Sequence, residues 1–222
     1  MEKDRGTRVI AIVALVVGVV GLTIGFAAFA SNLTISSSAE VTANQSNFNV
    51  DFTSTSSGEV STSDIVPIKN PTTITASNGT ISNSGDPTVT GLHATFSEPG
   101  QSATYTFWAK NIGSYVAYLN SITIGNATSS ETYKKCTAKN TTTQSLVDDA
   151  CAGISMTVAV SNGTASQAAT SSSVATINNH SLALNGYDEI VVTISYASGS
   201  AIADGDFDVA FGNITLAYSS VD

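Results

Sequence analysis

The segment Phe96–Ile124, "FSEPGQSATYTFWAKNIGSYVAYLNSITI", decides the expected fold of this chain. Apolar and polar side chains alternate in its first half, which places Tyr105 and Phe107 on one face of an extended strand. Ahead of this strand, Pro99 fixes φ at one corner and Gly100 permits a positive φ at the next, so the pair predicts a type II turn. An Asn-x-Gly step then leads into a second alternating run. The segment therefore predicts two strands joined in a hairpin-like pair.

The same two-residue period recurs along the rest of the chain. It predicts further strands at "NLTI", "FNVDF", "ISMTVAV", "EIVVTISYA" and "DFDVAFGNITLAYS". "SLVDDA" and "ASQAATSSSVA" are predicted to form short helical turns, and no long helix is evident after the N-terminal run. About 190 residues of this kind suffice for one domain. The sequence therefore predicts an all-β fold, a single β-sandwich of jelly-roll type over residues 31–222. A transmembrane barrel would need longer, more evenly spaced strands.

The composition is typical of a secreted, β-rich protein. The chain has 222 residues, of which 42% are hydrophobic and only 11% charged, and its formal net charge is -9. Its polarity therefore comes mainly from Ser, Thr, Asn and Gly. No Arg follows residue 30, and phosphate contacts need clustered Lys and Arg. The sequence therefore argues against a nucleic-acid partner.

An uncharged run of 22 residues, Val9–Ala30, follows a basic start. As a helix it would measure roughly 33 Å, which is enough to cross a bilayer. One interpretation of residues 1–30 is a secretory signal cut before Ser31, because Ala28 and Ala30 stand at the two positions that a signal peptidase reads. The other is a retained membrane anchor. Pilin-like processing just ahead of the run is a third route, but the acidic residue expected after the cut is missing.

Two cysteines, Cys136 and Cys151, enclose the polar part of an insert at 132–151. In a chain that leaves the cytoplasm, this arrangement predicts one disulfide bond, and the alternative is two unpaired thiols. Closing a loop of this size stabilises a fold by roughly 3 kcal/mol in the chain-entropy model. The pair forms no CxxC and has no histidine beside it, which argues against a zinc or redox site.

Three parts of the chain resemble the TasA/camelysin family of secreted matrix-fibre proteins. They are the turn, strand and Asn-x-Gly step of Phe96–Ile124, the apolar leader ending in "FAAFAS" that runs directly into a strand, and the closing "ADGDFDVAFGNITLAYSS". The resemblance implies a jelly-roll subunit that polymerises outside the cell by donor-strand exchange, in which the N-terminal strand of one subunit fills a groove in the next. Residues 31–42 are then the candidate donor strand.

The residues of this candidate strand suit such an exchange. A strand released by cleavage has unpaired backbone groups and exposes the apolar side chains of Leu33, Ile35 and Val41. Pairing with the exposed sheet edge of a neighbour would satisfy the backbone groups and bury those side chains. While the leader holds the end of the strand in the membrane, this pairing is impeded.

The sequence contains no evident catalytic constellation. Camelysin relatives are sometimes described as metallopeptidases, but His93 and His180 are the only histidines and neither lies in an HExxH motif. No GxSxG motif occurs either. Asp204, Asp206 and Asp208 alternate in "ADGDFD" and would share one face of a strand, which makes them a weak calcium candidate. A solvated turn and strand edge is the better interpretation.

The sequence therefore predicts a secreted structural subunit of an extracellular or cell-surface fibre, in a biofilm matrix or a pilus-like assembly, and not an enzyme. Its expected partners are copies of itself, together with other matrix or surface components, and no cofactor is expected. Contact with the membrane is expected only through the N-terminal apolar segment. The alternative is a surface adhesion or binding module that its N-terminus tethers to the membrane.

Overall fold

The computed structural model describes residues 30–35, 48–56, 64–84, 87–127, 130, 132–140, 142–162, 166–169, 174–177 and 179–220. The predicted leader up to residue 29, including Ala28, and the donor-strand candidates after residue 35, including Val41, lie outside these ranges. Over the described ranges, no helix combines the length and the hydropathy that a membrane span requires.

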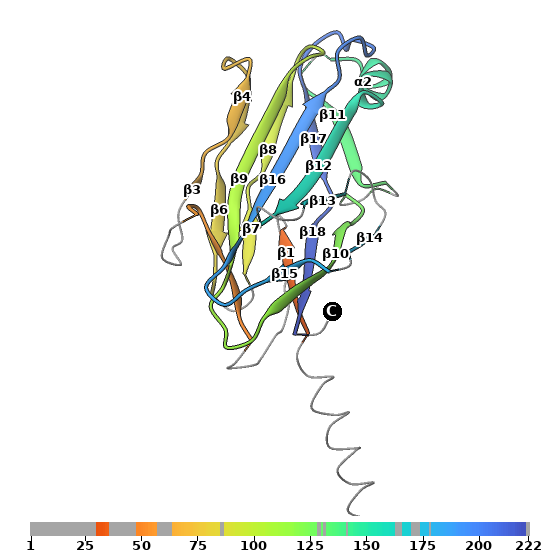
Figure 1. The fold of residues 1–222 in the computed structure, drawn as a ribbon. Helices are drawn as coiled ribbons and strands as arrows, with labels where there is room; N and C mark the ends of the chain where they lie inside the picture. Colours follow the sequence, from red (N-terminus) through yellow and green to blue (C-terminus); the bar gives the residue numbers. More distant parts are fainter. Residues whose placement is uncertain are drawn as a thin grey trace, which may run out of the picture.

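Strands make up most of the described chain, and they form three sheets (Figure 1). The six-stranded sheet has the spatial order β13 (Ser166–Ala169), β12 (Ile154–Ser161), β16 (Tyr187–Tyr196), β9 (Ser102–Asn111) and β2 (Val50–Thr53), and β4 (Ile68–Asn70) also pairs with β9. The four-stranded sheet has the order β11 (Lys134–Ala138), β17 (Phe207–Phe211), β8 (His93–Phe96) and β5 (Thr75–Ser77).

The third sheet has eight strands. Its order is β14 (Val174–Thr176), β10 (Ala117–Ile124), β18 (Ile214–Ser219), β1 (Ala30–Ile35), β7 (Thr88–Thr90), β6 (Gly79–Ser82) and β3 (Asp64–Ile65), and β15 (Ser181–Leu182) also pairs with β10. Helix α2 (Gln144–Cys151) follows β11. Apart from the parallel contact between β1 and β7, the strand pairs are antiparallel. The predicted all-β fold is confirmed.

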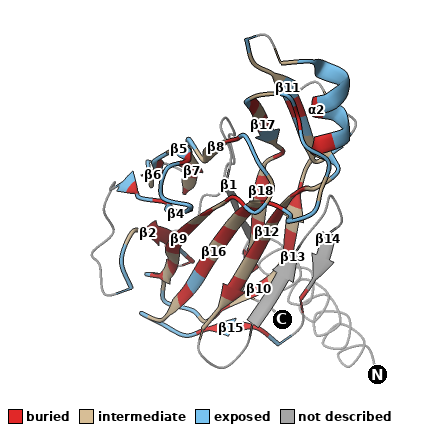
Figure 2. Ribbon diagram, turned by 90° about the horizontal axis from the view of Figure 1, so that it is seen from above, coloured by how far each residue is buried: buried red, intermediate tan, exposed pale blue. Residues whose placement is uncertain are grey.

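The central strands are where the alternating pattern predicted them. In β9, Tyr105, Phe107 and Ala109 are fully buried, whereas the residues between them are half-buried. The turn ahead of β9 contains Gly100 at φ 94°, as its position after Pro99 predicts. Figure 1 shows the six-stranded sheet lying in front of the other two sheets, and Figure 2 shows buried residues along strands of both layers. The core therefore lies between the layers.

Three local predictions were wrong. The two strands of Phe96–Ile124 were predicted to form a hairpin-like pair, but they are β9 and β10, which lie in different sheets and do not pair with each other. A two-residue period identifies a strand with one buried face but not the strand beside it. The run "DFDVAFGNITLAYS" was predicted as one strand, but it divides at Gly212 into β17 and β18, which lie in different sheets. A Cβ atom at Gly212 would lie 1.8 Å from the carbonyl oxygen of Gly125, so the backbone approaches there as only glycine permits. The segment "ASQAATSSSVA" contains strands β13 and β14 in place of a helical turn. "SLVDDA" does lie in helix α2.

Candidate functional site: the groove filled by β1

The layer opposite the six-stranded sheet opens into a fork. Strands β17 and β18 follow one another along the chain, and so do β7 and β8. At the closed end of the fork β17 pairs directly with β8, with Phe207 opposite Phe96 and Asp208 opposite Thr95. At the open end, β18 and β7 are separated by β1, which pairs with both (Figure 1). The walls of the site are therefore β18 and β7, and β1 fills it.

The register places the predicted donor residues opposite core residues. All six residues of β1 pair with β18, from Ala30 opposite Ser219 to Ile35 opposite Ile214, and Leu33 lies opposite Leu216. Leu216 is fully buried and Ile214 is 2% exposed. Directly opposed residues of an antiparallel pair lie on the same face of a sheet. The groove therefore presents core-facing positions to the residues at 33 and 35.

In the single chain, "NLTI" pairs within its own subunit. Strand β1 begins at Ala30, the residue before the predicted cleavage point, and Ser31 lies opposite Tyr218. The described part of β1 ends at Ile35, opposite Ile214, and further along the wall Asp208 already pairs with Thr95. The fork is therefore closed at that end.

A cavity of about 210 Å³ lies at the closed end of the fork. Its lining is mainly apolar and includes Val89, Leu92, Met156, Ile194 and Phe211. Met156 and Ile194 belong to β12 and β16 of the opposite layer, so the cavity reaches toward the middle of the sandwich. It is lined by Ile214 and Val89, the two residues opposite Ile35. The cavity therefore adjoins the end of β1.

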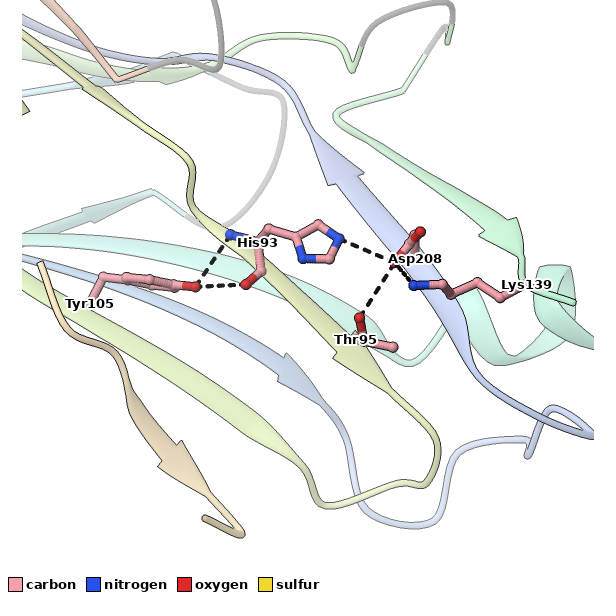
Figure 3. A network of polar contacts seen from close by, with 5 residues as sticks. All are labelled: His93, Thr95, Tyr105, Lys139 and Asp208. Carbon is pink, nitrogen blue, oxygen red and sulfur yellow. Dashed lines mark hydrogen bonds and ion pairs between the residues drawn. The ribbon is translucent and has the colours of Figure 1, made fainter. Parts of the chain in front are cut away.

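A polar network lies beside this cavity, on the solvent side (Figure 3). One carboxylate oxygen of Asp208 lies 3.1 Å from His93 Nε2 and 3.1 Å from Lys139 Nζ, and 3.4 Å from the Thr95 hydroxyl. The side chains of His93, Lys139 and Asp208 are each about two-fifths exposed. Tyr105 reaches across from β9, and its hydroxyl lies 2.8 Å from the carbonyl oxygen of His93. Burial raises the pKa of Tyr105 to about 12. The network therefore joins the two layers.

The three aspartates of the calcium candidate do not converge. Asp204 accepts hydrogen bonds from the hydroxyl and the backbone N–H of Thr143, ahead of α2, and these bonds lower the pKa of Asp204. Asp206 uses its backbone carbonyl, which accepts from Thr142 and Lys139. The carboxylate of Asp208 contacts Lys139. In the part of the chain that the structure describes, no three acidic, histidine or cysteine side chains are grouped to hold a metal ion.

The two cysteines form a disulfide bond that links β11 to the last residue of α2. The polar composition of the segment between the two cysteines is typical of a surface insert, but part of the segment belongs to a sheet, because β11 pairs with β17 along five residues. Val147 and Ala150 of α2 are fully buried. The ammonium group of Lys134 also donates to the carbonyl oxygen of Cys151, at 2.6 Å. The bond therefore holds α2 against the sheet.

Replacing both cysteines, Cys136→Ser and Cys151→Ser, is expected to lower the free energy of unfolding by about 3 kcal/mol. The two cysteines are 15 residues apart in the sequence, and a bond that closes a loop of this length restricts the unfolded chain by about that amount. Denaturant titrations of the parent and the variant measure this difference. Reduction of the parent serves as the control and should give a similar loss. A variant that folds but never assembles, under conditions where the parent does, would mean that the bond belongs to a contact between subunits.

The most buried polar cluster was not predicted from the sequence. His180 Nε2 lies 2.9 Å from one carboxylate oxygen of Asp188, and the hydroxyl of Tyr218 donates to the other at 2.5 Å. All three side chains are at most 1% exposed. Burial, together with the charge of Asp188, raises the pKa of Tyr218 well above its usual value. A substrate has no access here, so the cluster ties β16 of one layer to β18, a wall of the groove, in the other.

Asp51 of β2 lies between the buried residues Val50 and Phe52 and is itself only 8% exposed. Desolvation by this burial raises the pKa of Asp51 from 3.8 to about 6. Folding therefore favours the protonated carboxyl. This contribution to stability is fully present below pH 4 and is lost as the pH rises through about 6.

The variant Asp51→Asn cannot ionise at this position, so it should gain stability relative to the parent as the pH rises from 4 to 7. Thermal unfolding midpoints of both proteins at pH 4, 5, 6 and 7 provide the comparison. Asp149→Asn, at an exposed position of α2, is the matched control and should show no such trend. A constant difference between parent and Asp51→Asn across this range would contradict the prediction.

Comparison with protein-family models finds no match for this chain, and neither the curated proteins nor the solved structures contain a significant match.

Proposed function

We propose that the protein is a secreted structural subunit of an extracellular or cell-surface fibre, and that it polymerises by exchange of β1 between neighbouring subunits. The observation that carries the proposal is the fork between β18 and β7, in which β1 pairs with β18 along its whole length and with β7 over its last two residues. Without β1, both walls would expose unpaired backbone groups beside the buried residues Leu216 and Val89. An identical strand from another copy supplies the same hydrogen bonds and the same apolar side chains.

The chain between β1 and β2 supports this exchange. Twelve residues, 36–47, separate Ile35 from Phe48, the next described residue. Twelve residues span up to about 40 Å when extended, so β1 can leave its own groove and enter that of a neighbour without disturbing β2. We further propose that the two layers are of jelly-roll type. Cleavage before Ser31 would release the end of the strand that lies opposite Ser219 and Tyr218.

Self-filling of the groove competes with exchange, because a strand on the same chain has an effective concentration in the millimolar range. In the proposed pathway, the apolar leader holds the start of β1 in the membrane, and release of the leader lets the strand enter a neighbouring groove. The subunit needs no cofactor and no catalytic residue for this role.

Electron microscopy of the extracellular protein tests the proposal, and fibres whose only component is this chain are the expected result. N-terminal sequencing of the same material should begin at Ser31. A chain that starts at Met1 or Thr7 would instead favour the anchor or the pilin-like route. Dispersed particles at every concentration, from protein with Ser31 at its start, would contradict polymerisation.

A further inference from the structure

Large apolar side chains are exposed in few places on the described part of the chain. These are Val66, Ile68, Ile112, Tyr115, Leu146, Leu184 and Ile202. Scattered exposure of this kind needs no explanation, but grouping at one end does. Ile112, Tyr115 and Leu184, here called the entry patch, lie at the end of the sandwich where β1 begins. Leu146 and Ile202, here called the far patch, lie at the opposite end.

The entry patch is built around one buried side chain. The amide of Asn111, itself fully buried, donates to the carbonyl oxygens of Tyr115 and Leu182, and its oxygen accepts from the N–H of Gly113. The backbone N–H of Asn185 also donates to the carbonyl oxygen of Asn111. These bonds hold the loop after β9 and the turn before β16 together. The exposed residues that flank them therefore form one fixed surface.

The far patch lies on two connections that are also joined. Leu146 belongs to the first turn of α2 and is 39% exposed, and Ile202 lies between β16 and β17 and is 65% exposed. Asp204 and Thr143 link these connections by two hydrogen bonds of 2.7 and 2.8 Å. Figure 1 places α2 and the connection from β16 to β17 at the end away from the start of β1.

The direction of β1 relates the two patches. The strand runs from the entry end toward the closed end of the fork, so its last residue, Ile35, is the one nearest the far end. Beyond Ile214 the neighbouring chain runs through β17 to Phe207, seven residues or about 23 Å, and β17 pairs there with β8. Twelve residues, the number between Ile35 and Phe48, can span that distance and more when extended. On the other side of this interval, Asn49 lies beside the entry patch, because its carbonyl oxygen accepts from the N–H groups of Ile112 and Gly113.

We infer that the entry patch of one subunit docks on the far patch of the subunit that receives its β1, so that copies stack end to end. The partner is a second copy of this chain, and the inference rests on the proposed strand exchange. When the β1 of one subunit occupies the groove of a neighbour, the entry end of the donating subunit comes to lie at the far end of the receiving subunit. The contact joins different surfaces on the two copies, so it repeats without closing and produces a filament.

Cross-linking of two full-length variants, Leu184→Cys and Ile202→Cys, tests the stacking directly. The native cysteines are bonded to each other, so each variant carries one added thiol. Both altered positions are exposed, so the fold should be retained, and circular dichroism checks this. An oxidised mixture of the two should give mixed dimers in at least threefold excess over dimers of either variant alone. A predominance of same-variant dimers would overturn the end-to-end arrangement.

The same cross-link in a background of Leu33→Asp and Ile35→Asp separates the two proposals. It should be lost there, because β1 no longer enters the neighbour's groove. Fibres of the parent without a mixed cross-link would overturn the stacking alone. Absence of both fibres and cross-link would overturn stacking and strand exchange together. A cross-link that persists in this background would support the end contact and overturn its dependence on strand exchange.

An assembly measurement gives an independent readout. Ile112→Ser combined with Leu184→Ser should raise the concentration for half-maximal assembly about tenfold, because a lost apolar contact of about 1.4 kcal/mol corresponds to that factor. Val66→Ser combined with Ile68→Ser is the matched control. These residues are 69% and 71% exposed, but Val66 lies just ahead of β4 and Ile68 is its first residue, so both are outside the two patches as defined and their replacement should leave assembly unchanged. Equal effects of the two pairs would overturn the inference.

Discussion

Under the proposed strand exchange, protein carrying Leu33→Asp and Ile35→Asp is expected to form no fibres at concentrations where the parent would assemble. The register places these positions opposite Leu216 and Ile214, and Ile35 also lies opposite Val89, all of them core residues. Burial of a Leu or Ile side chain stabilises by roughly 1.5 to 3 kcal/mol. Replacing both by charges removes that contribution and adds the cost of placing unpaired carboxylates in an apolar groove.

The matched control for this variant is Asn32→Asp combined with Thr34→Asp. It adds the same two charges to the same strand, at the alternate positions opposite Ala217 and Thr215, which are half-buried. This control should still assemble. Sizing and circular dichroism of all three proteins distinguish the outcomes. Unchanged fibres from the Leu33→Asp, Ile35→Asp variant would contradict donor-strand exchange. An unfolded variant would mean that β1 is an ordinary strand that pairs within its own subunit and is needed for that subunit to fold.

Removal of the buried carboxylate by Asp188→Ala should cost about 3 to 5 kcal/mol of unfolding free energy. The substitution leaves the ring of His180 and the hydroxyl of Tyr218 buried without their shared acceptor, and unsatisfied buried groups of this kind are costly. Tyr218→Phe removes only one hydrogen bond to Asp188 and should cost less, about 1 to 3 kcal/mol. Denaturant titrations at one pH measure both values.

Asp208→Ala provides the comparison, because Asp208 is also an aspartate that pairs with a histidine. Its side chain is 39% exposed and that of His93 is 40% exposed. Exposed ion pairs contribute at most about 1 kcal/mol, so this variant should lose far less stability than Asp188→Ala. Similar losses for the two alanine variants would show that burial does not decide the strength of these pairs.

The alternation of side chains predicted where individual strands lie along the chain better than it predicted which strands lie side by side in a sheet. "ISMTVAV" and "EIVVTISYA" lie almost wholly in β12 and β16, because a two-residue period identifies a strand with one buried face. The same period does not tell which strands pair. It also missed the break at Gly212, where a close approach of Gly125 in the folded chain requires glycine. The fork depends on that break and therefore could not be predicted.

The candidate site was predicted in part. The apolar positions 33 and 35 were singled out because they alternate with polar neighbours just after the leader. The buried cluster of His180, Asp188 and Tyr218 was missed because no motif joins its members, and Tyr218 follows Asp188 by 30 residues along the chain. One signal was present: Asp188 occupies the same alternate positions of β16 as Ile190 and Val192, which predicts an inward-facing carboxyl. Such a carboxyl needs buried partners, and tertiary structure alone identifies them.

The orientation of β1 also determines how the proposed fibre would bear tension. The strand lies along the line between the entry end and the far end, with β18 pairing along its full length and β7 along its last two residues. A pull along the fibre would act parallel to β1, so its hydrogen bonds to both walls would be loaded in shear and would have to break together. A strand that crossed the fibre axis would instead peel away one bond at a time, at a much lower force. The link between subunits would therefore be strongest in the direction in which the fibre is stretched.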